Sequence, residues 1–321
     1  MNKTAGDGQH RRAANNSDGR VLEAADIARS IRTSWLTRYA TEPAIRRVGS
    51  LLAIALFVLI GYLVFKELEA VAWDHVREAL KAITWLDIAV SILATAVSYI
   101  ALIGYDFLAL RQVGQRNVPL SVVSITSFIA HSLSFSLGFG ALTGGAVRLR
   151  LYGAAGLAPE KVVSIGILCA LTFWLGLAAV TSLSLIVDPY AVHALTGAGA
   201  WTIRGLGIAI VLAIAGWIAV SAVRPIPQDV HGWSFPLPGA AATLNSVLVG
   251  TLDTVAAAFA LWLLLPAGTE VSFAHFIVVF SVATAIGVAS HVPGGLGVFE
   301  GLIVLGLPQV PEAALIASLV L

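Results

Sequence analysis

Long apolar runs with few charges alternate with short polar segments along most of the chain. A helix of about 20 apolar residues crosses a hydrocarbon core of about 30 Å. The pattern therefore predicts an all-α polytopic membrane protein with about seven to eight transmembrane helices. The runs are Val48–Phe65, Leu86–Leu110, Val118–Val147, Val162–Val187, Gly205–Val223, Gly239–Leu265, Val271–Phe299 and Gly301–Leu321.

Two of these runs are too long for a single straight crossing. There are 31 uncharged residues between Arg116 and Arg148, and 29 between Glu270 and Glu300. A straight helix of either length would reach about 45 Å. Both runs contain helix breakers, so we expect two broken or re-entrant segments. The breakers are Ser136, Gly138, Gly140, Gly144 and Gly145 in the first run, and Gly287, Pro293, Gly294, Gly295 and Gly297 in the second; Gly144, Gly145, Gly294 and Gly295 are taken as the glycines of the broken helices.

The chain divides into a basic arm, residues 1–47, and a membrane domain, residues 48–321. The arm holds nine Lys/Arg and five Asp/Glu, a net charge of +4. Positive charge beside the first span predicts a cytoplasmic amino terminus. Part of the arm is expected to be disordered. Its Val21–Tyr39 segment has the pattern of an interfacial amphipathic helix, and a solvated basic tail is the alternative interpretation.

Charge bias also predicts the direction of later segments. If the first long run simply crossed outward, Arg148, Arg150 and Lys161 would lie outside, against the positive-inside tendency. A re-entrant segment returns them to the cytoplasmic side. It places residues 188–204 outside and residues 224–229 inside. The apolar end at Leu321 predicts that the chain is truncated and that its parent continues further.

Composition excludes several classes of function. Of the 321 residues, 58% are hydrophobic and 12% are charged, which disfavours a soluble enzyme or a nucleic-acid binder. The single cysteine, Cys169, cannot form an intrachain disulfide. His131, His275 and His291 lack further ligands at metal-binding spacing, and the glycine pairs lack the context of a nucleotide loop. We therefore expect no catalytic residue, no metal and no cofactor.

A weak internal repeat points to a candidate site. Gly144-Gly145 is followed by Arg150, and Gly294-Gly295 is followed by Glu300 at the same spacing. Upstream, Gly104-Tyr105-Asp106 on one span resembles the stretch Gly250–Asp253 on another. In the predicted topology these two spans run in opposite directions, which makes the halves inverted repeats. Interrupted segments at matching places in two such halves are typical of a transport site.

The few charges within this repeat are the candidate site residues. An ionised side chain near the centre of a membrane helix costs about 2.5–3.5 kcal/mol, so it usually has a partner or a function. Simpler interpretations remain: Arg148 and Arg150 as headgroup anchors, Arg150–Glu300 as an ion pair, and Asp253 as a neutral acid bonded to Asn245. The candidate residues are Asp106, Arg148, Arg150, Asp253 and Glu300.

The stretches 142–152 and 291–300 resemble the membrane domain of bacterial lysylphosphatidylglycerol synthetases, the multiple peptide resistance factors. Gly104-Tyr105-Asp106 fits as well, and the resemblance covers about residues 45–321. It implies a bacterial inner-membrane protein whose membrane domain moves aminoacylated phosphatidylglycerol to the outer leaflet. It also implies a downstream cytosolic domain that uses aminoacyl-tRNA to make this lipid, so no transferase chemistry falls on residues of this chain. By the same resemblance, Asp106, Arg148 and Glu300 act in translocation.

The charges suit a lipid with a phosphate and ammonium groups. Arg148 and Arg150 are expected to contact the phosphate, and Asp106, Glu300 and Asp253 the amines. Two alternatives are a secondary transporter of a small polar solute or ion, and a membrane anchor or regulatory part of a lipid-modifying transferase. The expected partners are an anionic or aminoacylated phospholipid and the downstream transferase domain, without direct nucleic-acid binding. Gly140 and Gly144 have the spacing of a helix-dimer motif, but they lie in a segment expected to be broken, so they are weak support for a homo-oligomer.

Overall fold

The computed structural model separates the chain into two units, Met1–Ala70 and Val71–Leu321, and every described residue belongs to the second. The basic arm and the Val48–Phe65 run lie outside the described residues, so their predictions stay untested. The described residues are 78, 80–137, 140–223, 229–230, 233–234, 238–265, 269, 271–290 and 292–320.

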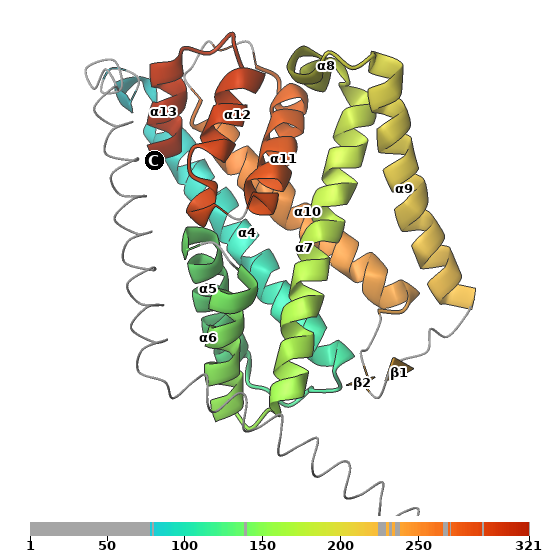
Figure 1. The fold of residues 1–321 in the computed structure, drawn as a ribbon. Helices are drawn as coiled ribbons and strands as arrows, with labels where there is room; N and C mark the ends of the chain where they lie inside the picture. Colours follow the sequence, from blue (N-terminus) through green and yellow to red (C-terminus); the bar gives the residue numbers. More distant parts are fainter. Residues whose placement is uncertain are drawn as a thin grey trace, which may run out of the picture. The chain divides into compact units, whose positions relative to one another are not determined.

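The described part is almost entirely helical, which confirms the all-α prediction (Figure 1). A single antiparallel pair of two-residue strands, β1 and β2, sets Val230 opposite Trp233. Five helices of this part are long and apolar enough to span a membrane: α4, α5, α7, α9 and α10. The elements are α4 (Trp85–Gln112), α5 (Leu120–Leu137), α6 (Gly140–Ala154), α7 (Pro159–Val187), α8 (Tyr190–Thr196), α9 (Ala200–Val223), β1 (Asp229–Val230), β2 (Trp233–Ser234), α10 (Ala240–Leu263), α11 (Phe273–Ala289), η1 (Pro293–Gly295), α12 (Val298–Gly306) and α13 (Glu312–Val320).

Local sequence signals explain where several of these helices begin. Thr84 and Asp87 form a reciprocal capping box at the start of α4, in which the Thr84 Oγ1 atom accepts from the Asp87 N–H group at 3.2 Å. Pro159 opens α7, where its missing N–H group costs nothing. The Ser272 Oγ atom accepts from the His275 N–H group and so caps α11.

The first long run forms a helical hairpin of α5 and α6, which pack against each other. The two helices are separated at residues 138–139, so the run does turn back. The prediction that Gly144 and Gly145 make the break is wrong, because both lie inside α6. At Gly144 a Cβ atom would lie 2.3 Å from the Ser134 Oγ atom, so this glycine permits close packing. Gly140 faces Ser134 too, so these two glycines pack within their own hairpin.

The second long run forms a hairpin of α11 and α12 joined through η1. Gly294, Gly295 and Gly297 lie in the turn with φ angles of 65°, 66° and 78°, which only glycine adopts readily. The last apolar run, predicted from position 301 to 321, is not one continuous helix. It is divided between α12 and α13 by a turn at residues 307–311, which contains two prolines.

The two hairpins enter from opposite ends of the unit and meet at their tips. In Figure 1 the α5–α6 hairpin lies below the α11–α12 hairpin. At the meeting point the carbonyl oxygen of Ser136 lies 3.6 Å from the position that a Cβ atom of Gly294 would take. The loops at residues 113–119 and 155–158 lie at one end and α8 lies at the other, in agreement with the relative order that charge bias predicts.

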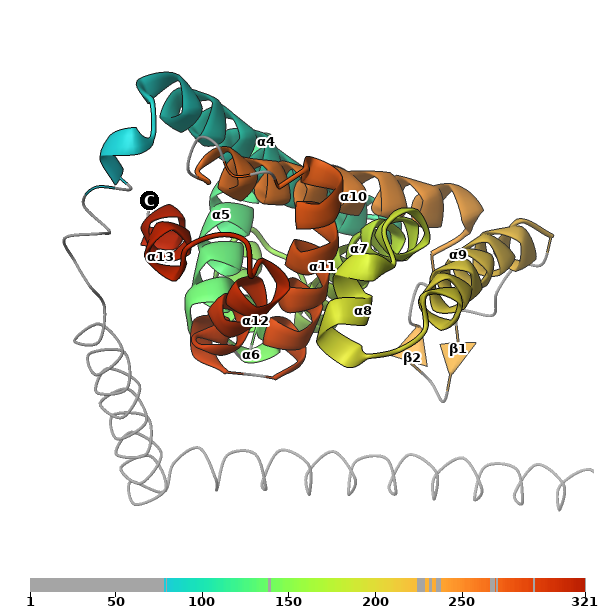
Figure 2. The same ribbon diagram turned by 90° about the horizontal axis from the view of Figure 1, so that it is seen from above.

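Helices α4 and α10 cross each other along one face of the unit, and their chain directions are opposed (Figures 1 and 2). Each is followed by a hairpin and then by a further helix, so α4–α7 and α10–α13 share one order of elements and begin with helices of opposite direction. Helix α7 contacts members of both halves, and Gly176 lies against the backbone of Gly250 where α7 meets α10. The candidate acids are therefore carried by the two crossing helices of the repeats.

The positive φ of Gly294 gives a first testable prediction. An alanine there must adopt a left-handed backbone, so Gly294→Ala should lower the free energy of unfolding by about 1–2 kcal/mol. Gly301→Ala is the matched control, because no atom lies within 4 Å of its Cβ position inside α12. Thermal unfolding of both purified variants in one detergent measures the effect. Equal melting temperatures for the two variants would contradict the prediction.

Candidate functional site

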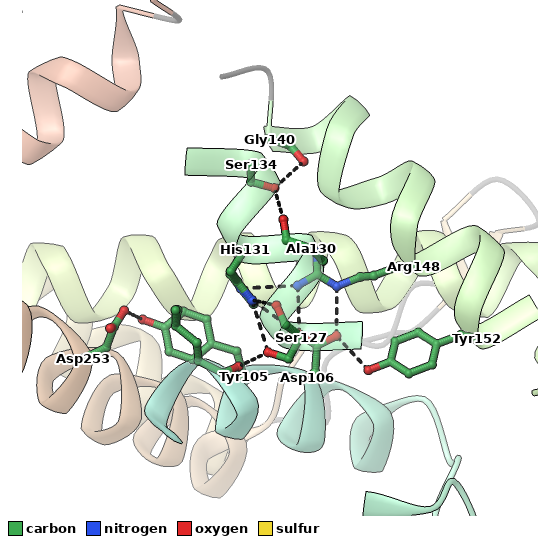
Figure 3. Close-up of polar contacts among 11 residues, drawn as sticks. Tyr105, Asp106, Ser127, Ala130, His131, Ser134, Gly140, Arg148, Tyr152 and Asp253 are labelled. Atoms are coloured by element: carbon green, nitrogen blue, oxygen red, sulfur yellow. Dashed lines mark hydrogen bonds and ion pairs between the residues drawn. The ribbon is translucent and has the colours of Figure 1, made fainter. Parts of the chain in front are cut away.

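A buried ion pair joins α4 to α6. The Arg148 Nε and Nη2 atoms each donate to one oxygen of the Asp106 carboxylate, both at 2.8 Å (Figure 3). Asp106 is 0% exposed and Arg148 is 5% exposed. This two-bonded geometry is the strongest that a guanidinium and a carboxylate form. The structure thus brings together two of the five predicted charges, one from the crossing helix and one from the hairpin.

Two more side chains complete the surroundings of this pair. The Tyr152 hydroxyl donates to the Asp106 Oδ1 atom at 2.9 Å. The His131 Nδ1 atom lies 2.9 Å from the Ser127 carbonyl oxygen, and its Nε2 atom lies 3.3 Å from the Arg148 Nη2 atom. A carbonyl only accepts and a guanidinium only donates, so this arrangement requires the singly protonated ring with its proton on Nδ1. The ring holds the hairpin against the pair without adding a charge.

Asp253 lies in a second buried cluster beside the first. Its carboxylate accepts from the Ser98 Oγ atom at 2.5 Å and from the Tyr105 hydroxyl at 2.8 Å. Asn245, the partner suggested by sequence, is exposed and is not part of this cluster. That interpretation is wrong because Asn245 precedes Asp253 by two turns of α10, about 12 Å along the helix, and both partners of Asp253 come from α4.

Tyr105 lies between the two clusters. Its hydroxyl reaches Asp253, while the next residue, Asp106, points to Arg148 on the other side of α4 (Figure 3). The Tyr105 ring meets the His131 ring edge-on, with centroids 5.7 Å apart. Tyr105 is 1% exposed, so any movement of its ring must displace one of these neighbours.

Arg150 and Glu300 lie apart from the buried pair. The Arg150 side chain is exposed, and the Glu300 Oε2 atom accepts from the Gly297 N–H group at 2.7 Å. Among the described residues, the ion pairs involve neither of them, so the suggested Arg150–Glu300 bridge is wrong. The repeat alignment behind it is offset, because Gly294 lies in a turn while Gly144 lies inside a helix.

Sequence reasoning missed the uncharged members of the site. Tyr152 lies four residues after Arg148 on the same helix face, and this spacing is a usable signal. Ser98 and Tyr105 lie seven residues apart on one face of α4. A tyrosine inside an apolar span needs a hydrogen-bond partner. Tyrosines near the two spans that carry acids could therefore have been predicted to donate to those acids.

A cavity of about 230 Å³ opens near the end of α4, about one turn beyond Asp106. It contains two arginines, and the Arg111 guanidinium stacks over the Phe107 ring at 4.4 Å. Within the described ranges neither arginine of this cavity belongs to an ion pair. The lining residues are Phe107, Leu110, Arg111, Gln115, Arg116, Val118 and Val123.

The arrangement is suited to binding a molecule that carries both signs of charge. Removing either partner of a buried ion pair leaves an uncompensated charge, which is strongly unfavourable. A ligand with its own anion and cation can replace both bonds at once and leave neither charge unpaired. The profile of one family, described as the lysylphosphatidylglycerol synthase TM region, matches residues 50–321. The chain belongs to this family.

Individual relatives agree with that membership, which confirms the resemblance drawn from the glycine motifs. "Uncharacterized protein slr0712" of Synechocystis sp. is 29% identical over 271 residues, covering 84% of this chain and 82% of that protein. The inner membrane protein YbhN of Escherichia coli is 25% identical over 268 residues, covering 82% of each. Phosphatidylglycerol lysyltransferase of Staphylococcus aureus is 25% identical over 272 residues. The match covers 84% of this chain but 31% of the lysyltransferase.

Proposed function

We propose that this membrane domain translocates aminoacylated phosphatidylglycerol, of the lysylphosphatidylglycerol type, from the inner to the outer leaflet. The observation that carries the proposal is the buried, two-bonded Asp106–Arg148 pair in a member of this family. Such a lipid presents a phosphate and ammonium groups on one headgroup. The pair offers one partner for each.

The headgroup enters by exchanging partners with the pair. Its phosphate takes the place of Asp106 on the Arg148 guanidinium, and an ammonium takes the place of Arg148 on Asp106. Each charge keeps a counter-charge throughout, so the step avoids the cost of an isolated ion in a low-dielectric interior. The acyl chains stay in lipid. Arg150 and Glu300 serve as further contacts that the headgroup meets outside the buried pair.

The basic cavity at the end of α4 supports an entry point for this lipid. Arg111 and Arg116 line it beside apolar side chains, a combination that suits a phosphodiester and the first part of its acyl chains. Lys161 follows the loop at the same end of the unit. The excess of positive charge favours a cytoplasmic position for this end, in the bacterial inner membrane and with the amino terminus on the same side.

In this proposal the enzyme that makes the lipid is a partner of the membrane domain. The Staphylococcus relative is named a phosphatidylglycerol lysyltransferase and is about three times as long as the matched region, at 31% coverage. We infer that the parent of this chain makes its lipid with a downstream cytosolic domain that uses aminoacyl-tRNA. The chemistry of that domain lies outside these residues.

A leaflet assay tests the translocation. The chain is expressed in a bacterium that makes lysylphosphatidylglycerol but lacks its translocator, and outer-leaflet amines are labelled with a membrane-impermeant reagent. We expect the wild type to expose the lipid. The double variant Asp106→Asn/Arg148→Gln, which removes both buried charges together, should expose at least tenfold less with an unchanged total amount of lipid.

Two controls make this result specific. Glu160→Gln removes an exposed charge in the first turn of α7 and should behave as wild type. Arg150→Gln should cause a smaller loss than the double variant, because Arg150 is exposed. Full exposure of the lipid by a double variant present at wild-type levels would refute the proposal.

A secondary transporter of a small polar solute or ion is the second candidate. The inverted repeat and the second buried acid, Asp253, favour it. It predicts solute uptake into vesicles that is sensitive to Asp253→Asn and indifferent to the lipid headgroup. Uptake that needs aminoacylated lipid would exclude this candidate.

A further inference from the structure

The two buried acids have hydrogen-bond partners of different chemistry. Asp106 is bonded to a guanidinium, which can only donate, so this carboxylate must be ionised to keep its bonds. Asp253 is bonded to two hydroxyls, from Ser98 and Tyr105, and a hydroxyl can donate or accept. In the described part of the chain, no Lys, Arg or His forms an ion pair with Asp253. Only the second acid is free of a fixed counter-charge.

These partners satisfy Asp253 with and without a proton. When it is ionised, both hydroxyls donate to it, as observed. When it is protonated, its own O–H group donates to one hydroxyl oxygen. Ser98 can then turn its proton to the carbonyl four residues earlier in α4, a bond that serine commonly makes in helices. Neither state leaves a buried polar group unpaired, which is the condition for a site that loads and unloads.

We propose that Asp253 is the proton-binding site that couples lipid translocation by this chain to a proton gradient. The inference rests on the proposed function and adds its energy source. Asp253 is 6% exposed in α10, at the crossing with α4, where an unpaired carboxylate is costly and a proton removes that cost. The proton enters as H⁺ from one side, neutralises the carboxylate, and leaves as H⁺ on the other side.

Tyr105 connects this site to the ion pair. Its hydroxyl is bonded to Asp253, its ring meets His131, and it precedes Asp106 in α4. A protonated Asp253 offers the Tyr105 hydroxyl a neutral oxygen in place of a charged one, so this hydrogen bond weakens and the Tyr105 ring is freer to move. Rotation of this buried ring presses on His131, which holds Arg148. Loading of the proton thus favours opening of the Asp106–Arg148 pair.

The other ionisable groups around Asp253 have their own partners or lie further away. On α7, Cys169 is a buried thiol that interacts with Tyr105. On α11, His275 is paired with Asp188, and on α9 the Arg204 guanidinium lies over Trp201. Among the described residues of these helices, none is bonded to Asp253. A change in its protonation therefore acts on its two hydrogen-bond partners, Ser98 and Tyr105.

The test uses the full chain in phosphatidylglycerol vesicles that contain a fluorescent lysylphosphatidylglycerol and an internal pH indicator. We expect a pH gradient to change the translocation rate of the wild type by at least about fivefold, the lower range of measured coupling between sites. Proton movement should accompany it. Asp253→Asn should abolish the response to the gradient and the proton movement, whatever its rate of translocation without a gradient. Glu160→Gln is the matched control and should respond as wild type.

The outcomes separate the coupling from the function. A wild type that translocates equally with and without the gradient, or an Asp253→Asn variant that still responds, overturns the coupling alone. A wild type that translocates under neither condition overturns the proposed function and the coupling with it. A second variant, Tyr105→Phe, keeps the acid and the ring. Because it removes one donor to the ionised carboxylate, it should move the midpoint of the rate against pH upward, whereas a purely structural defect would lower the rate without moving the midpoint.

Discussion

Arg148→Met should destabilise the folded protein by about 3–5 kcal/mol, because it leaves the Asp106 carboxylate buried without its guanidinium, with the Tyr152 hydroxyl and the neutral His131 ring beside it. The double variant Asp106→Leu/Arg148→Met should recover most of this loss. It replaces the pair by apolar side chains of similar size and leaves no buried charge behind. Chemical or thermal unfolding in detergent measures both variants on the same scale.

The prediction is tested by comparing the stability lost by the single variant with that lost by the double variant. Arg150→Met is the matched control, since it removes an exposed arginine two residues further along the same helix and should stay within about 0.5 kcal/mol of wild type. If the single and double variants lose equal stability, the bond between Asp106 and Arg148 is not what holds α6 to α4.

Gly250→Ala should prevent normal packing of α7 against α10. The new Cβ atom would lie 2.5 Å from the Thr172 carbonyl oxygen and 2.8 Å from the Gly176 Cα atom. Backbone atoms cannot rotate away as a side chain can, so the two helices must separate. Overpacking of this kind costs about 1–3 kcal/mol and sometimes more. We expect a lower melting temperature and less monodisperse protein after extraction in mild detergent.

Two glycines elsewhere serve as controls for this experiment. Gly166 in α7 and Gly216 in α9 have no atom within 4 Å of their Cβ positions, so alanine there should be neutral or slightly stabilising. Gly176→Ala should behave like Gly250→Ala, since its Cβ atom would lie 2.1 Å from the Gly250 carbonyl carbon. A Gly250→Ala protein that melts with the controls would contradict this account of the crossing.

Length and apolarity predicted most of the fold. A run of 31 uncharged residues cannot cross a bilayer once and end at its surface, so a turn had to lie within it. The first run offered five breakers from position 136 to 145, and the sequence did not show that the separation falls at 138–139. Gly294 has a positive φ and helps to form a turn, whereas Gly144 is helical and makes room for Ser134. Sequence cannot separate these two uses, because both depend only on the missing Cβ atom.

The sequence predicted only some of the charges that form the buried site. Asp106 and Arg148 are 42 positions apart, and the order of acid, broken run and arginine was enough to bring them into one hypothesis. Arg150 was grouped with them, although residues two apart on a helix do not share a face. This rule predicts that only one of the two arginines, Arg148 or Arg150, can face the core. The hydroxyl partners of Asp253 depend on how α4 and α10 cross, which the sequence does not specify.

The Asp106–Arg148 pair also determines how much charge moves across the membrane field when the helices that carry it shift. Moving one elementary charge through 100 mV changes its energy by about 2.3 kcal/mol, so exposed gating charges make a protein voltage-sensitive. The bonded pair has a net charge of zero and moves as one unit between α4 and α6. In a shift that keeps this pair intact, Arg148 therefore adds no gating charge, and Arg150, exposed on the same helix, is the charge of the α5–α6 hairpin on which the membrane potential acts.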